Sequence, residues 1–210
     1  MSDAPTTARA ADEHLRRADP VLAALIDAQG PLPEPAERPD HYGALVRAIV
    51  GQQLSTKAAR AIHARVLELF GGRAPTPQEL LAFDPEALRT AAGLSRAKVT
   101  FLRSLAEHVE SGELDLDHVA DLPDDEVLAE LTAVKGIGVW TAHMFLMFQL
   151  GRPDVLPVGD LGIRRAVERA YRLRDLPSAA ELEAIAEPWR PHRTAACLHL
   201  WRSLDNAPDA

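Results

Sequence analysis

Residues 134–142 read Val-Lys-Gly-Ile-Gly-Val-Trp-Thr-Ala and lie between two segments with a helical pattern. Gly136 and Gly138 are separated by one apolar residue, and Lys135 adds a positive charge beside the first glycine. Glycines permit a tight turn, and the backbone N–H groups that open the next helix are suited to binding a phosphate. Asp160 then follows at the start of a later helical segment. A phosphate-binding turn followed by a helix-entry carboxylate indicates chemistry on nucleic acid.

The pattern of the whole chain is helical. Strand-like alternation is weak, and Ser55, Thr76, Asp84 and Ser95 stand where N-cap residues are expected. We therefore expect an all-α protein of about ten helices joined by short loops. Apolar residues recur at helical spacing in residues 15–28, 42–50, 58–70, 99–109, 127–134, 140–150, 161–171 and 195–204.

Two breaks divide this helical pattern. Residues 31–39 are rich in proline and predict a stiff, extended connector, and Gly-Arg-Pro at 151–153 forms the second break. We expect a central helical domain of residues 41–150 that contains the glycine turn. Residues 12–40 and 151–210 are expected to form a second helical lobe from both chain ends. Residues 1–11 are predicted to be a disordered tail.

The composition excludes several classes of protein. Cys197 is the only cysteine, so a disulfide framework and a four-cysteine metal or iron–sulfur site are excluded. The eight histidines are scattered without ligand spacing, so we expect no catalytic metal and no cofactor. No apolar run is long enough for a membrane span, and the N-terminus lacks signal-peptide features. We expect a cytoplasmic protein of a bacterial-type cell with no membrane partner.

The formal net charge of −8 argues at first against a nucleic-acid partner. Ten of the acids, however, lie between residues 107 and 130, where there is no Lys or Arg. Without that block the rest of the chain carries +2, and residues 160–174 have five arginines against two acids. Because the local field governs binding more than the total charge, DNA remains a possible partner.

Four motifs in order carry a resemblance to a known family. They are Gly-Gln-Gln-Leu at 51–54, Val-Lys-Gly-Ile-Gly at 134–138, Val-Gly-Asp-Leu-Gly at 158–162, and the segment from Trp189 to Trp201. Together they resemble the helix-hairpin-helix (HhH-GPD) DNA glycosylase superfamily, specifically its 3-methyladenine DNA glycosylase II (AlkA-type) branch, over residues 40–204. The resemblance implies two helical lobes with an active-site cleft between them.

The resemblance also implies roles for the turn and the carboxylate. Lys135, Gly136, Ile137 and Gly138 would form the hairpin that grips a DNA phosphate through its backbone, with a monovalent cation bound to the backbone of residues 133–138. Asp160 matches the catalytic carboxylate, which stabilises positive charge on the sugar and orients or deprotonates water. The plainer alternatives are that the glycines only separate two helices and that Asp160 only caps a helix.

Trp140 bears on the type of glycosylase. Members of the superfamily that also cut the DNA backbone carry a lysine nucleophile two residues after the second hairpin glycine, where this chain has Trp140. The resemblance places Trp140 and Trp201 in the walls of the base pocket, and Met144 stands where some relatives have a tyrosine. Either tryptophan could instead be a core residue.

A flipped base leaves a gap that a wedge residue must fill. Gln53 matches the wedge position, with Leu54 as its neighbour, although a loop glutamine can also simply bond local backbone. The resemblance thus implies a monofunctional glycosylase that removes alkylated purines from duplex DNA, and we expect it to act as a monomer near the nucleoid. A non-catalytic helix-hairpin-helix DNA-binding protein and a glycosylase/lyase for oxidised bases are the alternatives. The lesion spectrum stays open among 3-methyladenine, 7-methylguanine, ethenoadenine and hypoxanthine.

Overall fold

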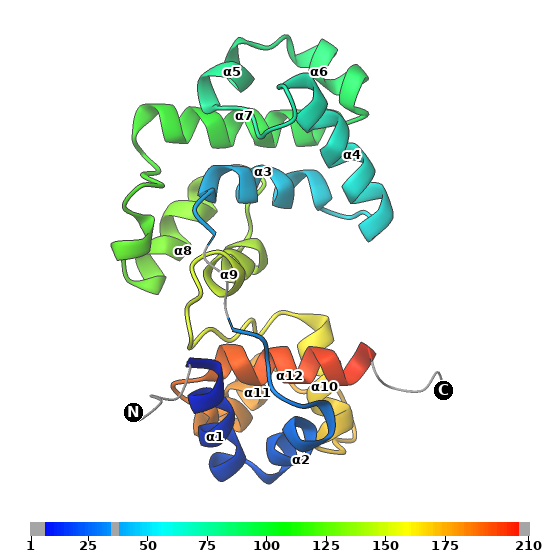
Figure 1. Cartoon of the computed structure of the whole chain (residues 1–210), viewed down its shortest axis with the longest axis vertical. Coiled ribbons are helices and arrows are strands. Elements are labelled where there is room, and N and C mark those ends of the chain that lie inside the picture. Colours follow the sequence, from blue (N-terminus) through cyan, green and yellow to red (C-terminus); the bar gives the residue numbers. More distant parts are fainter. Residues whose placement is uncertain (1–6, 35–37, 206–210) are drawn as a thin grey trace, which may run out of the picture. The chain divides into compact units, whose positions relative to one another are not determined.

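The computed structural model describes residues 7–34 and 38–205 (Figure 1). In these residues all regular structure is helical, with twelve α-helices, two 3-10 helices and no strand. The prediction of an all-α protein is therefore confirmed. Within the same residues, no helix has both the length and the apolar character needed to cross a membrane.

The chain divides into two compact units, with the divisions between residues 37 and 38 and between 150 and 151. The sequence analysis placed them at 40/41 and 150/151. The first unit contains α1 (Thr7–Ala18), α2 (Pro20–Gln29), α10 (Leu161–Ala170), α11 (Ala179–Ala186), η2 (Glu187–Trp189) and α12 (Arg193–Asp205). The second contains α3 (His41–Gly51), α4 (Thr56–Leu69), α5 (Pro77–Ala82), α6 (Pro85–Ala92), α7 (Arg96–Ser111), η1 (Val119–Asp121), α8 (Asp124–Ala133) and α9 (Val139–Phe148).

The second unit is built around α3 and α7. Helix α3 packs against α4, α7 and α9, and α7 also packs against α5 and α6, while α8 and α9 form an adjacent pair (Figure 1). Helix α3 lies at the centre of this unit because one of its faces is apolar. Leu45, Val46, Ile49 and Val50 lie on that face and are almost fully buried from solvent. Burial of each such side chain stabilises the fold by about 1.5–3 kcal/mol.

The helix starts follow the cap residues of the sequence. The side chains of Ser55, Thr76, Asp84 and Ser95 each accept a hydrogen bond from a backbone N–H in the first turn of the helix they precede. Thr76 and Glu79 form a complete capping box. A cap of this kind contributes about 1 kcal/mol, so these boundaries are fixed locally rather than by tertiary packing.

In the first unit, α12 packs against α1, α2 and α10 (Figure 1). Its buried face includes Cys197 and Leu200, and Leu22 and Ile26 of α2 are also fully buried. The indole of Trp189 is completely buried and donates a hydrogen bond to Asp19 Oδ2 (2.9 Å). Because this unit contains both the N-terminal and C-terminal helices, it forms only when distant parts of the chain meet.

The predicted disordered tail is wrong for residues 7–11, which belong to α1. Ala11 is buried, and Oδ1 of the next residue, Asp12, accepts a hydrogen bond from Nε2 of the buried His199 of α12 (2.8 Å). These long-range contacts stabilise a helix that the alanine-rich, polar sequence did not reveal. Residues 1–6 of the predicted tail lie outside the described residues.

The His199 contact makes the stability of the first unit depend on pH. Burial lowers the pKa of the His199 imidazole from its ordinary value of 6.5, although Asp12 opposes the shift. The folded protein therefore holds His199 neutral where the unfolded chain would protonate it. The stability associated with neutral His199 is fully present above pH ~6.5 and is lost as the pH falls below it.

We therefore expect the melting temperature to fall between about pH 7.5 and pH 5.5. His199→Gln should lower stability at neutral pH but flatten this acid limb, measured by thermal unfolding across the range. His118→Gln is the control, because the hydrogen bond from His118 to Asp115 raises the pKa of His118 and its contribution is lost as the pH rises. An equal decrease in melting temperature between about pH 7.5 and pH 5.5 in His199→Gln and wild type would show that His199 does not cause this pH dependence.

Candidate active site

The glycine turn has the helix-hairpin-helix form that the sequence predicts. Helix α8 ends at Ala133, α9 begins at Val139, and the five residues between them, Val134–Gly138, are called the phosphate hairpin below. Ile137 N–H donates to the Val134 carbonyl (3.0 Å), and the Ile137 side chain is buried. Gly138 caps α9 without a side-chain hydrogen bond. The first N–H groups of α9 have no acceptor within their own helix, which makes this terminus suited to an anion.

Gly136 is required by its surroundings. Its φ of +92° lies in the region that favours glycine, and a Cβ added there would overlap the ring of Phe101 on α7. Its carbonyl oxygen accepts a hydrogen bond from Gln52 Nε2 (2.8 Å). Lys135 N–H donates to Ser104 Oγ (3.2 Å), and the Lys135 side chain is exposed. The hairpin is therefore fixed by α7 and Gln52, with its charged side chain directed to solvent.

The proposed cation at residues 133–138 would use backbone carbonyl oxygens as ligands, and such oxygens suit hard cations. Two of these carbonyls, those of Val134 and Gly136, already accept the hydrogen bonds described above. A carbonyl oxygen has two lone pairs and can accept a hydrogen bond and still act as a ligand. The residues therefore fit a cation without requiring one.

The predicted wedge lies in the turn of residues 52–55 between α3 and α4, called the wedge turn below. Gln53 has a φ of +57°, an uncommon conformation for a residue with a side chain. Gln53 is exposed and Leu54 is 37% exposed. Gln52, in contrast, points to the hairpin carbonyl. Gln52 therefore binds the phosphate hairpin, whereas Gln53 and Leu54 form the exposed tip of the turn.

Trp140 and Met144 lie four residues apart on α9 and so share one face of that helix. The indole of Trp140 is 52% exposed, which excludes the alternative that it is a core residue of the second unit. Met144 is half-buried. Together they give the start of α9 an apolar surface beside the phosphate hairpin.

Asp160 is held by two donors in the first unit. Its Oδ1 accepts the N–H of Ile163 (2.7 Å) as the N-cap of α10, and also accepts the indole N–H of Trp201 on α12 (3.0 Å). The carboxylate is half-buried. The N-cap role is therefore real, and a second hydrogen bond orients the same group. A fixed carboxylate at a helix entry can stabilise a developing positive charge.

A family model described as "HhH-GPD superfamily base excision DNA repair protein" matches residues 46–191, which include the phosphate hairpin and Asp160. The chain belongs to the HhH-GPD superfamily.

Two named relatives are similar to this chain over most of its length. It is 39% identical over 169 residues to DNA-3-methyladenine glycosylase 1 of Schizosaccharomyces pombe, spanning 80% of this chain and 74% of that protein. It is 32% identical over 173 residues to DNA-3-methyladenine glycosylase 2 of Escherichia coli, spanning 78% of this chain and 58% of that protein.

Two solved structures are also similar to this chain over nearly its whole length. The structure of the 3-methyladenine DNA glycosylase of S. pombe in complex with abasic DNA matches with a TM-score of 0.85 and 35% identity, covering 96% of this chain and 99% of that chain. A DNA-3-methyladenine glycosidase of Bacillus halodurans matches with a TM-score of 0.84 and 39% identity, covering 98% and 91%.

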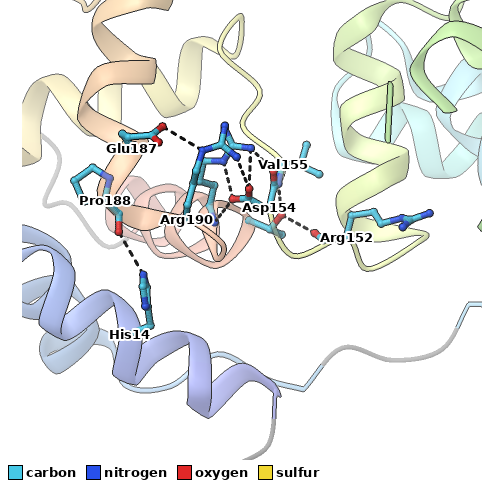
Figure 2. Close-up of polar contacts among 9 residues, drawn as sticks. His14, Arg152, Asp154, Val155, Glu187, Pro188 and Arg190 are labelled. Atoms are coloured by element: carbon cyan, nitrogen blue, oxygen red, sulfur yellow. Dashed lines mark hydrogen bonds and ion pairs between the residues drawn. The ribbon is translucent and has the colours of Figure 1, made fainter. Parts of the chain in front are cut away.

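A second set of contacts in the HhH-GPD chain fixes the loop that leads to Asp160. Figure 2 shows Asp154, in that loop, with Arg190 beside it. Arg190 Nη1 donates to Asp154 Oδ2 (2.7 Å), and Arg193 Nε at the start of α12 donates to Asp154 Oδ1 (2.7 Å). Thr194 Oγ1 donates to the Arg152 carbonyl (2.7 Å). Helix α12 is thereby tied to the loop at its start by Arg193 and to Asp160 further along by Trp201.

The site residues predicted for the HhH-GPD chain fall into two sets. The first unit brings Asp160 and Trp201 together, and the second contains the phosphate hairpin, the wedge turn, Trp140 and Met144. The sequence analysis missed Gln52 and Ser104. Gln52 lies in the quoted Gly-Gln-Gln-Leu motif, but a linear sequence does not show which amide faces inward. Ser104 gave no signal, since it lies within an ordinary amphipathic helix.

Proposed function

We propose that this protein is a monofunctional DNA glycosylase of the AlkA-type branch that hydrolyses the N-glycosidic bond of alkylated purines, such as 3-methyladenine, in duplex DNA. The proposal rests on the fixed position of the Asp160 carboxylate, whose Oδ1 accepts hydrogen bonds from the Ile163 N–H and the Trp201 indole N–H. The names of the similar S. pombe and E. coli enzymes support the alkylated substrate. We further propose that it acts as a monomer in the cytoplasm.

The chemistry follows from the charge that develops on the sugar. As the bond between the base and C1′ breaks, the sugar becomes oxocarbenium-like, and the Asp160 carboxylate stabilises that positive charge. The same carboxylate orients or deprotonates the water that attacks C1′. An alkylated purine already carries positive charge, so it leaves as a neutral base without a strong general acid. The products are the free base and an abasic site.

The remaining site residues bind and expose the base in this proposal. The phosphate hairpin grips the backbone, while Gln53 and Leu54 fill the gap left by the flipped nucleotide. The indoles of Trp140, in the second unit, and Trp201, in the first, are each proposed to offer an aromatic face to a cationic base, with a cation–π attraction of about 0.5–2 kcal/mol. Met144 contributes an apolar wall beside Trp140, and its thioether adapts to the shape of the base.

The proposed absence of strand cleavage depends on the lysines. The chain has only three, Lys57, Lys98 and Lys135, and none lies on α9. Lys98 donates a hydrogen bond to the Val50 carbonyl (2.8 Å). Trp140 stands where the Schiff-base lysine of the bifunctional relatives would be and has no nucleophilic atom. Hydrolysis by water is therefore the proposed route.

One assay tests the proposal against its alternatives. The protein is incubated with a methylated duplex and with a duplex containing an oxidised base, and free base and strand breaks are measured before and after hot alkali. The proposal predicts release from the methylated duplex, with breaks only after alkali. Binding without release from either substrate would support a non-catalytic DNA-binding protein. Breaks without alkali would support a glycosylase/lyase.

Gly162 offers a second test, because it lies beside both members of the Asp160–Trp201 pair, the proposed catalytic carboxylate and the indole that donates a hydrogen bond to it. A Cβ at Gly162 would lie 3.0 Å from both Asp160 Oδ1 and Trp201 Nε1, so these groups would have to shift. Alanine also has a higher helix propensity than glycine, which offsets part of the cost of this shift. Gly162→Ala should therefore keep the melting temperature close to wild type but slow base release by about tenfold or more. An unchanged rate would contradict the proposed pair.

A further inference from the structure

Helix α7 contacts the phosphate hairpin and the end of α3, the helix that precedes the wedge turn. Lys98, Phe101 and Ser104 occupy successive positions, three residues apart, along one row of this helix. At 1.5 Å per residue, the row spans about 9 Å. One end of the row contacts the helix before the wedge turn, and the other contacts the phosphate hairpin.

The Lys98 end fixes the C-terminal part of α3. Lys98 Nζ donates to the Val50 carbonyl (2.8 Å), which belongs to the last turn of α3. Carbonyls in a last helical turn have no partner within their own helix, so the ammonium satisfies one of them. Burial lowers the pKa of Lys98, as expected for an ammonium held against the protein. Lys98 therefore stabilises the end of α3 immediately before the wedge turn through one hydrogen bond of its ammonium.

The other end of the row fixes the hairpin. The Phe101 ring lies so close to Gly136 that no side chain fits there. Ser104 is 9% exposed, and its hydroxyl accepts the N–H of Lys135 (3.2 Å). The backbone of the hairpin is thus held on α7 at two consecutive residues, Lys135 and Gly136.

Gln52 joins the two turns directly. Its Nε2 donates to the Gly136 carbonyl (2.8 Å), although the two residues are 84 positions apart in the chain. Its neighbour Gln53 has the left-handed backbone conformation and is exposed. The amide of Gln52 therefore links the base of the wedge turn to the hairpin, while the tip of the turn stays available.

We propose that Gln52, Lys98 and Ser104 are positioning residues that set the distance between the phosphate hairpin and the wedge turn. This inference rests on the proposed DNA-binding function. Successive phosphates of one strand are about 3.4 Å apart along the helix axis, so a displacement of that size would move the wedge by one base step. A fixed distance lets the grip on one phosphate direct Gln53 and Leu54 to a defined gap in the base stack.

The test compares two duplexes that differ only at one position, an intact duplex and one with a tetrahydrofuran abasic analogue. Fluorescence anisotropy with the whole 210-residue chain gives the affinity for each duplex, and the ratio of the two affinities measures how well the wedge fits the gap. Gln52→Ala, Lys98→Met and Ser104→Ala should each reduce the preference for the abasic duplex about tenfold, the scale of one lost hydrogen bond. The affinity for the intact duplex should change by less than about threefold, because the phosphate contacts remain.

Arg103→Met is the matched control. Arg103 also lies on α7 and donates through Nη1 to a backbone carbonyl, that of Leu81 at α5 (3.2 Å), so the control loses the same charge and the same kind of bond. It should leave the preference unchanged, and Lys98→Arg should restore it. An unchanged preference in Lys98→Met, or an equal loss in Arg103→Met, would overturn the inference.

Folding and activity are measured separately. Should thermal unfolding show that Lys98→Met does not fold, Ser104→Ala and Gln52→Ala decide the question by the same ratio. A wild-type protein without any preference for the abasic duplex would overturn the inference. A wild-type protein that has the preference but releases no alkylated base would contradict the proposed enzymatic function while leaving the positioning role of Gln52, Lys98 and Ser104 intact.

Discussion

Asp160→Asn should reduce release of alkylated base by at least about 100-fold, because the amide cannot supply the negative charge that stabilises the developing cation. The same variant should keep the fold. Asparagine is as good an N-cap as aspartate, and its Oδ1 can still accept hydrogen bonds from the Ile163 N–H and the Trp201 indole. Single-turnover base release, thermal unfolding and affinity for an abasic duplex measure the three properties. We expect only the first to change greatly.

Two controls separate catalysis from capping. Asp84 caps α6 with the same geometry, accepting the Ala87 N–H at 2.7 Å, and Asp84→Asn should leave base release unchanged. Asp160→Ala removes the charge and the cap together, so it should lose about 1 kcal/mol of stability in addition to activity. Retained turnover in Asp160→Asn would show that another group hydrolyses the bond.

Gly136→Ala should have the largest effect of any substitution in the second unit. The new Cβ would overlap the Phe101 ring, and the φ of +92° is unfavourable for alanine. A clash and a strained backbone together should cost roughly 2 kcal/mol or more. Because the hairpin must shift to accommodate the methyl group, affinity for duplex DNA should fall by about tenfold or more. Thermal unfolding and anisotropy on an intact duplex measure the two effects.

Substitutions at two other glycines separate the effect of the steric clash from that of the strained backbone. Gly112 also has a positive φ (+76°), but no atom lies within 4 Å of an added Cβ, so Gly112→Ala should show backbone strain alone and normal DNA binding. Gly138 has a φ of −97° and open space, so Gly138→Ala should fold normally. If a phosphate approaches the N–H groups at the start of α9, Gly138→Ala should still bind DNA more weakly. Wild-type DNA affinity in Gly136→Ala would contradict the role of the hairpin.

Features governed by local chemistry were predictable from the sequence. Ser55, Thr76 and Asp84 marked helix starts because a cap acts on the three residues that follow it. The hairpin was equally visible, since Gly136 and Gly138 are separated by a single residue in a short turn. Local hydrogen bonding and backbone conformation decide these features, so the linear sequence contains the information.

Features that depend on distant contacts were not predictable. The sequence identified Asp160 and Trp201 separately but gave no sign that the indole N–H binds the carboxylate across 41 positions. The helix over residues 7–11 was missed because its stabilising contact, Asp12 with His199, joins the two ends of the chain. Gln52 was passed over in favour of Gln53 for the same reason. Each of these contacts requires the folded chain to bring together segments that a pattern search treats as independent.

We propose that this chain hydrolyses an alkylated purine from duplex DNA through Asp160. The most direct measurement is the mass and quantity of free base released from a duplex with a single 3-methyladenine, by wild type and Asp160→Asn in parallel. We predict that wild type releases 3-methyladenine and leaves an alkali-labile abasic site in an uncut strand, while Asp160→Asn binds the duplex and releases almost none. No release by the folded wild-type protein, or equal release by both, would contradict the claim.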